Sequence, residues 1–199
     1  MDINDVIKES KTGSGQHSTI LAPTNHLVHQ INGAMLKLEK GEERVYKSYD
    51  NTVDNSSTWP ESFLNRIDPN GCLLHVLHLK IGSPIICLRN LNPSRGLLNG
   101  TRLIVKSLLQ RTILATILTG PSKGEDVFIP RIWNTSDMSS DLPFTLLRLQ
   151  FPVSLCYSMT INKSQGQTMS NIILYLPSSL FSHGQLYVAL SRCNTTKGI

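Results

Sequence analysis

Two hydrophobic patterns follow one another near the N-terminus. Residues 18–25, STILAPTN, contain a short apolar run that Pro23 stops, which predicts a buried strand. An apolar side chain then recurs every three or four residues, at Leu27, Ile31, Met35 and Leu38. This spacing predicts an amphipathic helix, for which Thr24 or Asn25 is the candidate N-cap and Gly41 the candidate stop.

The middle of the chain changes from a polar connection to a series of short β-rich runs. Residues 42–70 are mostly polar and predict a long irregular connection with one short helix at ESFLNRI. From residue 78 to 150, apolar runs alternate with turn-prone pieces such as NPSRGLLNG. The runs are SPIICLRNL, TRLIVKSLL, TILATILTG, EDVFIPRI and FTLLRLQFP. Strands at this spacing predict a small antiparallel barrel or sandwich, and about 70 residues suffice for a barrel of the SH3-like kind.

After residue 150 the chain again shows helix and strand patterns like those near the N-terminus. VSLCYSMTINKSQ (153–165) predicts a short helix that the following glycine would end. NIILYLP (171–177) is a near-continuous apolar run, typical of a central strand in a parallel sheet. SHGQLYVALSRC (182–193) predicts a helix, with Ser182 and Gln185 in the spacing of a capping box.

The order of these patterns predicts an α/β domain that a smaller β domain interrupts. We expect an N-terminal extension at 1–17, an α/β domain made of 18–77 and 151–199, and an inserted antiparallel barrel at 78–150. Strands that alternate with helices favour a parallel sheet. The predicted fold class is therefore α/β.

Composition is that of a folded globular chain. Of the 199 residues, 40% are hydrophobic and 17% are charged, which excludes a disordered protein. MDINDVIKES at the N-terminus has no apolar run, so we expect no secretory signal. No apolar window approaches the roughly 18 residues that span a bilayer, and we expect no membrane partner. Four scattered cysteines fit reduced thiols in an intracellular protein, for which we expect a nuclear location.

Charge is distributed unevenly along the chain. Residues 1–77 hold 7 Lys and Arg against 10 acids, residues 78–150 hold 9 against 4, and residues 151–199 hold 3 against none. The basic excess in the last two segments favours an anionic partner, most simply nucleic acid. A solvated basic surface is the other interpretation, and charge alone does not separate the two.

Histidines and cysteines at short spacings give no metal site. Cys72, His75 and His78 lie three residues apart, as do His26 and His29. A zinc site would need further ligands at suitable spacing, so we interpret these as ordinary strand and helix residues.

A polar cluster precedes the last apolar run. Residues 160–168, TINKSQGQT, contain a single apolar side chain. Unpaired polar groups near a core cost about 1–3 kcal/mol each, so such a cluster needs partners, either the protein's own backbone or a ligand. Open α/β sheets bind ligands just outside the ends of their strands, which makes this cluster a candidate ligand site.

TINKSQGQT and GQLYVALSR (184–192) resemble the fifth and sixth motifs of superfamily 1 helicases of the PIF type. An ordered series extends the resemblance over about residues 18–198: ILAPTN, HQINGAML, LKIGSPIICLRNL, GLLNGTRLIV, LTGPSKGEDVFIPRI, LPFTLLRLQFP and FSHGQLYVALSR. The series is most similar to the helicases of Helitron transposons. The family resemblance also implies work in DNA repair, recombination and telomere maintenance.

The resemblance implies a specific architecture. Such helicases carry two RecA-like domains, the second interrupted by an SH3-like barrel between the fourth and fifth motifs. The chain would be that second RecA-like domain with its inserted antiparallel β barrel. ATP would then bind between the two RecA-like domains, and single-stranded DNA would lie across both.

The resemblance further implies a nucleotide-binding group. Arg192 matches the sixth-motif arginine that reaches the γ-phosphate, and it is the expected catalytic residue. A guanidinium fork suits this role because it stabilises charge spread over phosphoryl oxygens. Gly166 and Gln167 match the fifth-motif turn, where a backbone without Cβ can approach phosphates. The alternatives are that Arg192 only complements a helix dipole and that Gly166 is a plain helix stop.

A DNA-binding group is implied in the same way. Thr160, Asn162 and Lys163 match fifth-motif positions near the DNA strand. Hydroxyl, amide and ammonium groups contact phosphates without reading bases, as a motor that moves along any sequence requires. Thr24 and Asn25 match the fourth-motif region and would touch DNA or the nucleotide, although a capping role is at least as well supported.

Other basic and aromatic residues stay open to two interpretations. The basic residues of the expected barrel fit either the wall of a DNA channel or a solvated surface: Arg89, Arg95, Arg102 and Lys106. Phe151 and Tyr157 could stack on bases, but apolar packing is the favoured role for both.

The chain departs from the family in what an active motor needs. A phosphate-binding loop, G-x-x-x-x-G-K-[ST], and an acidic pair for Mg²⁺ are both missing from the sequence, and KTGSGQ (11–16) has the right residue types in the wrong order. We therefore expect ATP and Mg²⁺ only in the complete helicase, neither bound by this chain alone, and little or no hydrolysis of ATP.

The expected partners are single-stranded DNA and a first RecA-like domain that carries the loop. The chain would then be a fragment of a larger helicase or work beside another chain. The alternatives are a non-enzymatic single-strand-binding module and an inactive transposon remnant.

Overall fold

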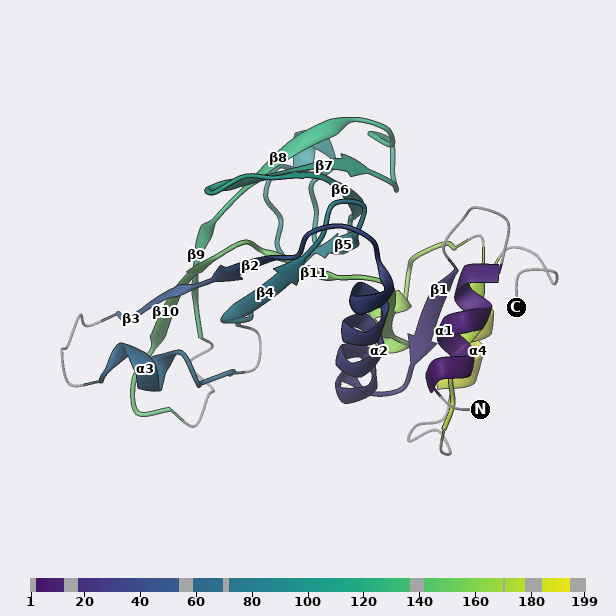
Figure 1. Cartoon of the computed structure of the whole chain (residues 1–199), viewed down its shortest axis with the longest axis horizontal. Helices are drawn as coiled ribbons and strands as arrows, with labels where there is room; N and C mark the ends of the chain where they lie inside the picture. The colour runs from purple at the N-terminus through teal and green to yellow at the C-terminus, as the bar shows by residue number, and fades with distance from the viewer. Residues whose placement is uncertain are drawn as a thin grey trace. The chain divides into compact units, whose positions relative to one another are not determined.

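The computed structural model describes residues 3–12, 18–53, 59–69, 72–136, 142–169, 171–177 and 184–193. The chain forms two compact units: unit 1 comprises Met1–Lys40 with Leu155–Ile199, and unit 2 comprises Gly41–Ser154 (Figure 1). The fold is mixed α/β, with one small parallel sheet and several antiparallel sheets, which confirms the predicted fold class. The domain boundaries expected from the sequence stay a prediction.

Unit 1 is built on a three-stranded parallel sheet with the order β12–β1–β13. Its strands are β1 (Thr19–Ala22), β12 (Ser158–Thr160) and β13 (Ile172–Leu174). Its helices are α1 (Ile3–Thr12), α2 (Asn25–Leu38) and α4 (Gln185–Leu190), with a 3-10 turn η2 (Asn162–Ser164). The predicted strand and the helix that follows it are confirmed, and Thr24 is the N-cap of α2.

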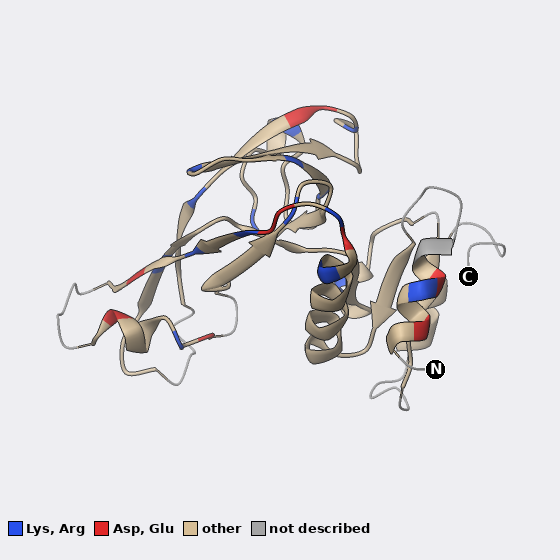
Figure 2. Ribbon diagram, viewed as in Figure 1, with Lys and Arg blue, Asp and Glu red and all other residues tan. Residues whose placement is uncertain are grey.

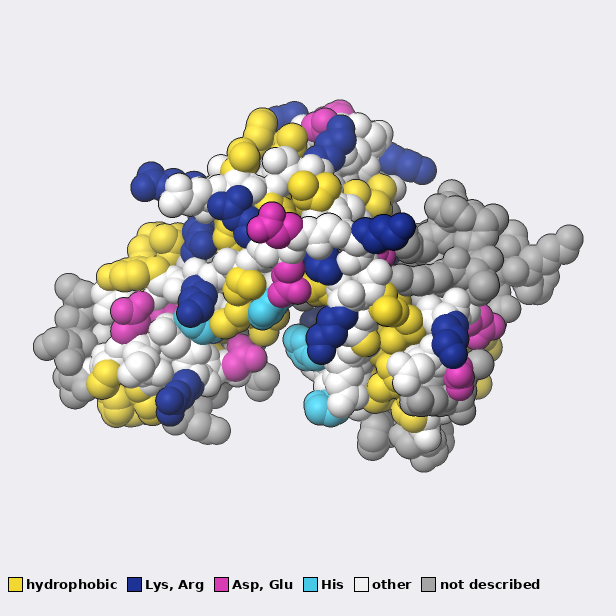
Figure 3. Space-filling view, in the orientation of Figure 1, with side chains coloured by type: hydrophobic (Ala, Val, Ile, Leu, Met, Phe, Trp, Pro, Cys, Tyr) yellow, Lys and Arg dark blue, Asp and Glu magenta, His cyan; other side chains and the backbone are white. Residues whose placement is uncertain are grey.

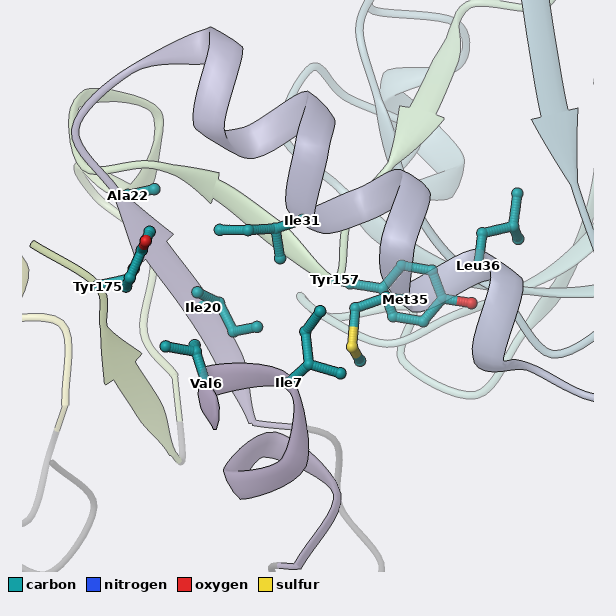
Figure 4. Packing of buried hydrophobic residues seen from close by; sticks show 9 residues of the cluster. All are labelled: Val6, Ile7, Ile20, Ala22, Ile31, Met35, Leu36, Tyr157 and Tyr175. Atoms are coloured by element: carbon teal, nitrogen blue, oxygen red, sulfur yellow. The ribbon is translucent and has the colours of Figure 1, made fainter. Parts of the chain in front are cut away.

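The core of unit 1 lies where α1 and α2 meet β1. Ile20 and Ala22 project from one face of β1, because alternate residues of a strand share a face. Around them pack buried side chains of both helices and of the neighbouring segments: Val6, Ile7, Ile31, Met35, Leu36, Tyr157 and Tyr175 (Figure 4). Tyr157 is therefore a core residue, as its favoured interpretation predicts.

A buried asparagine of α2 holds the outer strand of this sheet. Asn32 Nδ2 donates to the carbonyl oxygens of Leu155 at 3.1 Å and Ser158 at 3.3 Å. Its Oδ1 accepts from the Ser158 amide at 2.8 Å and the Ser158 hydroxyl at 3.2 Å. The side chain thus supplies to β12 the hydrogen bonds that a further strand would otherwise supply.

Unit 2 contains the antiparallel pairings. The larger sheet has the order β11–β5–β6–β7–β8, and its strands from β5 to β8 pair antiparallel. Two smaller antiparallel sheets have the orders β3–β10–β9 and β2–β4. The strands of the larger sheet are β5 (Pro84–Cys87), β6 (Arg102–Leu108), β7 (Thr112–Ile117), β8 (Asp126–Pro130) and β11 (Val153–Leu155).

The smaller sheets and the helical turns complete this unit. The remaining strands are β2 (Arg44–Lys47), β3 (Tyr49–Thr52), β4 (Val76–Leu79), β9 (Ile132–Thr135) and β10 (Leu146–Gln150). The helical elements are α3 (Glu61–Leu64) and the 3-10 turn η1 (Pro93–Arg95). Every strand predicted between residues 78 and 150 is present, as is the short helix in ESFLNRI.

A buried ion pair stabilises the smaller sheets. Arg148 on β10 is fully buried and donates to both carboxylate oxygens of Asp50 on β3, from Nε at 2.9 Å and from Nη2 at 2.8 Å. The same guanidinium donates to the carbonyl oxygens of Leu73, Leu64 and Ile67. One arginine therefore joins β3, β10, the end of α3 and the segment before β4.

Two sequence predictions on secondary structure are wrong. The helix expected at 153–165 is replaced by β11, β12 and η2, because Ser158–Thr160 are buried and pair with β1, and this tertiary pairing overrides the local pattern. The irregular connection expected at 42–70 contains β2 and β3. The buried residues of this stretch include Ser48 between the two strands and Asp50 and Thr52 on β3, so no apolar alternation revealed the strands.

Smaller corrections concern positions within elements. Leu38 of the predicted apolar stripe is 54% exposed, and α2 ends there, before Gly41. The run NIILYLP forms an edge strand of the described sheet, where β1 is central. The capping box cannot be compared, because Ser182 lies outside the described residues; Gly184 is the N-cap of α4.

Candidate functional site

The site is built at the carboxyl ends of two neighbouring parallel strands. In β1 and β12, Ala22 pairs with Thr160, and the Ile161 amide donates to the Ala22 carbonyl at 3.1 Å. Thr24 and Asn162 each lie two residues beyond these paired strand ends. Parallel pairing therefore brings the fourth-motif and fifth-motif segments to one edge of the sheet.

Thr24 and Asn25 occupy the start of α2. Thr24 is extended, and its hydroxyl accepts from the Leu27 amide at 3.4 Å, so the threonine caps the helix. Asn25 is the first residue of α2, and its side chain is exposed. The capping interpretation of Thr24 is confirmed, and a DNA or nucleotide contact for the two residues stays a prediction.

The fifth-motif segment divides into an inward and an outward part. Thr160 is buried, and its hydroxyl accepts from the Lys163 amide at 3.3 Å. Ser164 is fully buried and donates to the Ile161 carbonyl at 2.6 Å. Asn162 and Lys163, in contrast, are exposed on η2. The protein's own backbone satisfies the inward hydroxyls, whereas Asn162 and Lys163 are turned to solvent, and a DNA contact for Thr160, Asn162 and Lys163 stays a prediction.

Gly166 makes the turn that follows η2 possible. Its φ of +77° lies in the left-handed region, and a Cβ built on it would meet nothing within 4 Å. The turn is closed by the Gln167 amide, which donates to the Ser164 carbonyl at 3.0 Å, and by Gln167 Nε2, which donates to the Lys163 carbonyl at 3.3 Å. Gly166 is thus exposed, its backbone is open, and it directly follows the C-cap Gln165 of η2, so the helix-stop interpretation fits this 3-10 turn.

Arg192 joins the last helix to this turn. Its Nε donates to the Val188 carbonyl at 3.0 Å, its Nη2 to the Ser191 hydroxyl at 2.8 Å and its Nη1 to the Gln167 carbonyl at 3.4 Å. In return the Met169 amide donates to the Arg192 carbonyl at 3.0 Å. These contacts bring Arg192 to the turn that contains Gly166 and Gln167, and a role of the three residues in binding a nucleotide stays a prediction.

The two cations of the site are without an ion pair in the part of the chain that the structure describes. Neither Arg192 nor Lys163 forms an ion pair with a described carboxylate. The described residues likewise include no group of three or more His, Cys, Asp or Glu side chains that could hold a metal ion. The arrangement can therefore receive an anion, and its donors suit phosphoryl oxygens.

Other sequence candidates belong to unit 2. Lys106 pairs with Asp126 at 2.7 Å, and Arg89 donates to Asn134 Oδ1 at 2.9 Å, while Arg95 is exposed on η1. Phe151 is fully buried, which confirms its packing role. Among the described helices, none is long and apolar enough to cross a membrane.

Sequence reasoning missed Asn32, although a signal for it exists. An asparagine inside a helix and beside the apolar stripe competes with the helix unless it has partners of its own. Asn32 adjoins Ile31 of that stripe and is 5% exposed. Its role is to position β12, and through β12 the fifth-motif segment.

Comparison with known proteins finds a family match in the middle of the chain. Residues 62–108 match the family model of the DNA helicase Pif1, 2B domain. The chain contains the 2B-domain region of the Pif1 helicase family.

Similarity to Pif1 proteins extends well beyond the 2B-domain match. Human ATP-dependent DNA helicase PIF1 is 29% identical over 166 residues, which cover 80% of this chain and 23% of the human protein. The crystal structure of Pif1 helicase from Candida albicans has a TM-score of 0.76 at 27% identity, covering 98% of this chain and 48% of that one. Bacteroides Pif1 in complex with ADP-AlF3 and single-stranded DNA has a TM-score of 0.68 at 27% identity, covering 98% of this chain and 43% of that one. The chain thus spans about a quarter of the length of its human relative and less than half of the two crystallised Pif1 chains.

Proposed function

We propose that this chain is the part of a Pif1-type ATP-dependent DNA helicase that supplies the arginine side of the ATP site and contacts single-stranded DNA. The observation that carries the proposal is the link between Arg192 and the fifth-motif turn. The guanidinium is fixed by three neutral acceptors, so its charge stays available to a phosphate. A positioned guanidinium stabilises the charge that develops on phosphoryl oxygens during transfer.

The nucleotide would meet Arg192, Gln167 and Gly166 on this side of the site. The open backbone at Gly166 allows close approach, because no Cβ stands between it and a phosphate. Bound ATP with Mg²⁺ supplies the phosphoryl group, and a domain with a phosphate-binding loop and carboxylates would hold the ion. That domain would lie in the same polypeptide or in a partner chain.

DNA would meet the exposed part of the fifth-motif segment. Asn162 and Lys163 follow the end of β12 and turn their side chains to solvent. An amide and an ammonium group bind phosphates and sugars of any sequence, as translocation requires. Crystallised Bacteroides Pif1 with ADP-AlF3 and single-stranded DNA supports both ligands for this chain by similarity. The narrower assignment to Helitron helicases stays a prediction.

The proposal is tested by measuring binding and hydrolysis together. We expect the purified chain to bind a fluorescent oligothymidylate weakly, with an affinity that falls as salt rises. Lys163→Ala should weaken binding and reduce the salt dependence, whereas Lys37→Ala, a matched exposed lysine on α2, should change neither. Equal effects of the two substitutions would contradict the proposed DNA contact.

Hydrolysis separates the proposal from its alternatives. We expect no DNA-stimulated hydrolysis of ATP by the chain alone, because the phosphate-binding loop is missing from its sequence. Hydrolysis that DNA stimulates and Arg192→Ala abolishes would show that the chain holds a complete nucleotide site. A non-enzymatic binding module would bind DNA but would not gain hydrolysis when the missing domain is supplied.

A further inference from the structure

Unit 2 presents an outward row of side chains along residues 44–53. The inward residues of this stretch are buried: Tyr46, Ser48, Asp50 and Thr52. The outward residues between them are exposed: Val45, Lys47, Tyr49 and Val53. The alternation continues from β2 into β3, so one face of the smaller sheets is turned to solvent.

Two aromatic rings meet on this face. Tyr49 on β3 and Trp133 on β9 both pair with Leu149 on the central strand β10. Their ring centroids lie 5.9 Å apart at an interplanar angle of 75°. Tyr49 is 52% exposed and Trp133 is 50% exposed. We call Tyr49, Leu149 and Trp133 the aromatic platform.

Two cations lie next to the aromatic platform. Lys47 precedes Tyr49 by two residues and is exposed, and Arg131 precedes Trp133 by two residues. Arg131 Nη1 donates to the Lys47 carbonyl at 2.7 Å, which holds the guanidinium beside this strand. Within the described ranges, neither Lys47 nor Arg131 forms an ion pair with a carboxylate. Figure 2 marks the Lys and Arg positions along the ribbon of this unit, and Figure 3 shows Lys and Arg side chains beside hydrophobic ones.

Two neighbouring acids have contacts of their own. Asp50 turns inward and pairs with Arg148, and Glu43 contacts His78 at 2.5 Å. The face therefore combines exposed flat rings with two cations that pair with no described carboxylate, and the Arg131 guanidinium also lies over the buried rings of Tyr46 and Phe151. This combination favours an anionic partner with aromatic groups of its own, and an apolar protein segment would leave both cations without a counter-charge.

We propose that the aromatic platform is a stacking site for bases of single-stranded nucleic acid, with Lys47 and Arg131 on the flanking phosphates. Every base offers a flat π-face, so stacking of this kind tolerates any sequence. The inference rests on the proposed binding of single-stranded DNA and adds a second contact region, in unit 2, to the fifth-motif contacts in unit 1.

Intrinsic fluorescence tests the stacking directly. The chain holds two tryptophans, Trp59 and Trp133, and Trp59→Phe leaves Trp133 as the single reporter. The substitution keeps an aromatic ring beside Phe63 and Phe144, against which Trp59 packs. We expect oligothymidylate to quench Trp133 emission with the same midpoint as the binding isotherm.

Substitutions then separate stacking from general apolar contact. Tyr49→Leu and Trp133→Leu keep apolar volume but remove the flat ring, and each should weaken oligothymidylate binding about five- to tenfold. Lys47→Gln should weaken binding and lower the slope of log affinity against log salt concentration by about 1, because one phosphate contact is lost. The control is Phe128→Leu on β8, which removes an aromatic ring of 61% exposure from another sheet and should leave the affinity unchanged. Unchanged thermal unfolding confirms that each variant is folded.

The outcomes distinguish this inference from the proposed function. If Lys163→Ala weakens binding while the Tyr49 and Trp133 variants bind normally and Trp133 is not quenched, the platform inference is overturned and the fifth-motif contact stands. If the Leu variants change self-association of the chain but not DNA binding, the platform is a protein contact and the inference is again wrong. Absence of any oligothymidylate binding by the unmodified chain overturns both proposals.

Discussion

Arg192 Nη1 lies 3.4 Å from the carbonyl oxygen of Gln167, so the last helix and the fifth-motif turn are joined through the residue expected to meet a phosphate. The backbone completes the link, because the Met169 amide donates to the Arg192 carbonyl. Twenty-five residues of sequence separate the two partners. A change in the backbone of the turn should therefore alter the position of the Arg192 guanidinium.

Gly166→Ala tests the turn. The left-handed φ of +77° costs a residue with a Cβ about 1–2 kcal/mol, although the space around it is open. We expect the free energy of unfolding in urea to fall by that amount. The control is Gly33→Ala inside α2, where the same chemical change should be stabilising by about 0.5–1 kcal/mol. A neutral or stabilising Gly166→Ala would contradict the structural role given to this glycine.

Asn32→Ala tests the hydrogen bonds that hold β12. The substitution leaves the Ser158 amide and the carbonyls of Leu155 and Ser158 without their partner, and each buried unpaired group costs about 1–3 kcal/mol. We expect a loss of at least about 2 kcal/mol in chemical unfolding, together with faster hydrogen exchange at Ser158. A loss below about 0.5 kcal/mol would show that water replaces the asparagine.

Arg148→Met tests the buried ion pair of unit 2. Removing one partner of a buried pair leaves an uncompensated charge, here Asp50, and costs about 3–5 kcal/mol. The double substitution Arg148→Met with Asp50→Leu should recover part of this loss, and Arg95→Met on the exposed turn η1 should change stability by less than about 0.5 kcal/mol. An Arg148→Met protein as stable as the original would mean that the pair contributes nothing.

The lowered pKa of His75 predicts how the free energy of unfolding depends on pH. Burial lowers the pKa of His75 below its ordinary value of 6.5, and Arg148 and Lys47 lower it further, while Asp50 opposes them. The unfolded chain then takes up the proton first, so the free energy of unfolding should fall as pH drops below 6.5. His75→Gln should flatten this part of the curve. Stability that rises on acidification would reverse the sign and refute the assignment.

Local patterns predicted much of the fold, and particular residues show why they failed elsewhere. β1 and α2 could be predicted because Ile20, Ile31 and Met35 give apolar signals at the strand and helix periods. β3 could not, because its inward residues Asp50 and Thr52 are polar and depend on partners distant in sequence, such as Arg148.

For the candidate site, too, the sequence predicted some properties and not others. Its residues could be grouped from their motifs, but their exposure could not be predicted. Thr160 is buried against the backbone of its own turn, whereas Lys163 three residues later is exposed. Asn32 contacts β12 across 126 residues of sequence, so only the folded chain reveals that it positions the site.

The most direct test of the central claim is DNA-stimulated ATP hydrolysis by a fusion of this chain to a first RecA-like domain that carries a phosphate-binding loop. If Arg192 supplies the arginine side of the site, the fusion hydrolyses ATP, and Arg192→Ala lowers kcat about a thousandfold or more while KM for ATP changes far less. Arg95→Ala serves as the control and should keep the full rate. A fusion whose Arg192→Ala variant hydrolyses ATP at the unmodified rate would contradict the claim.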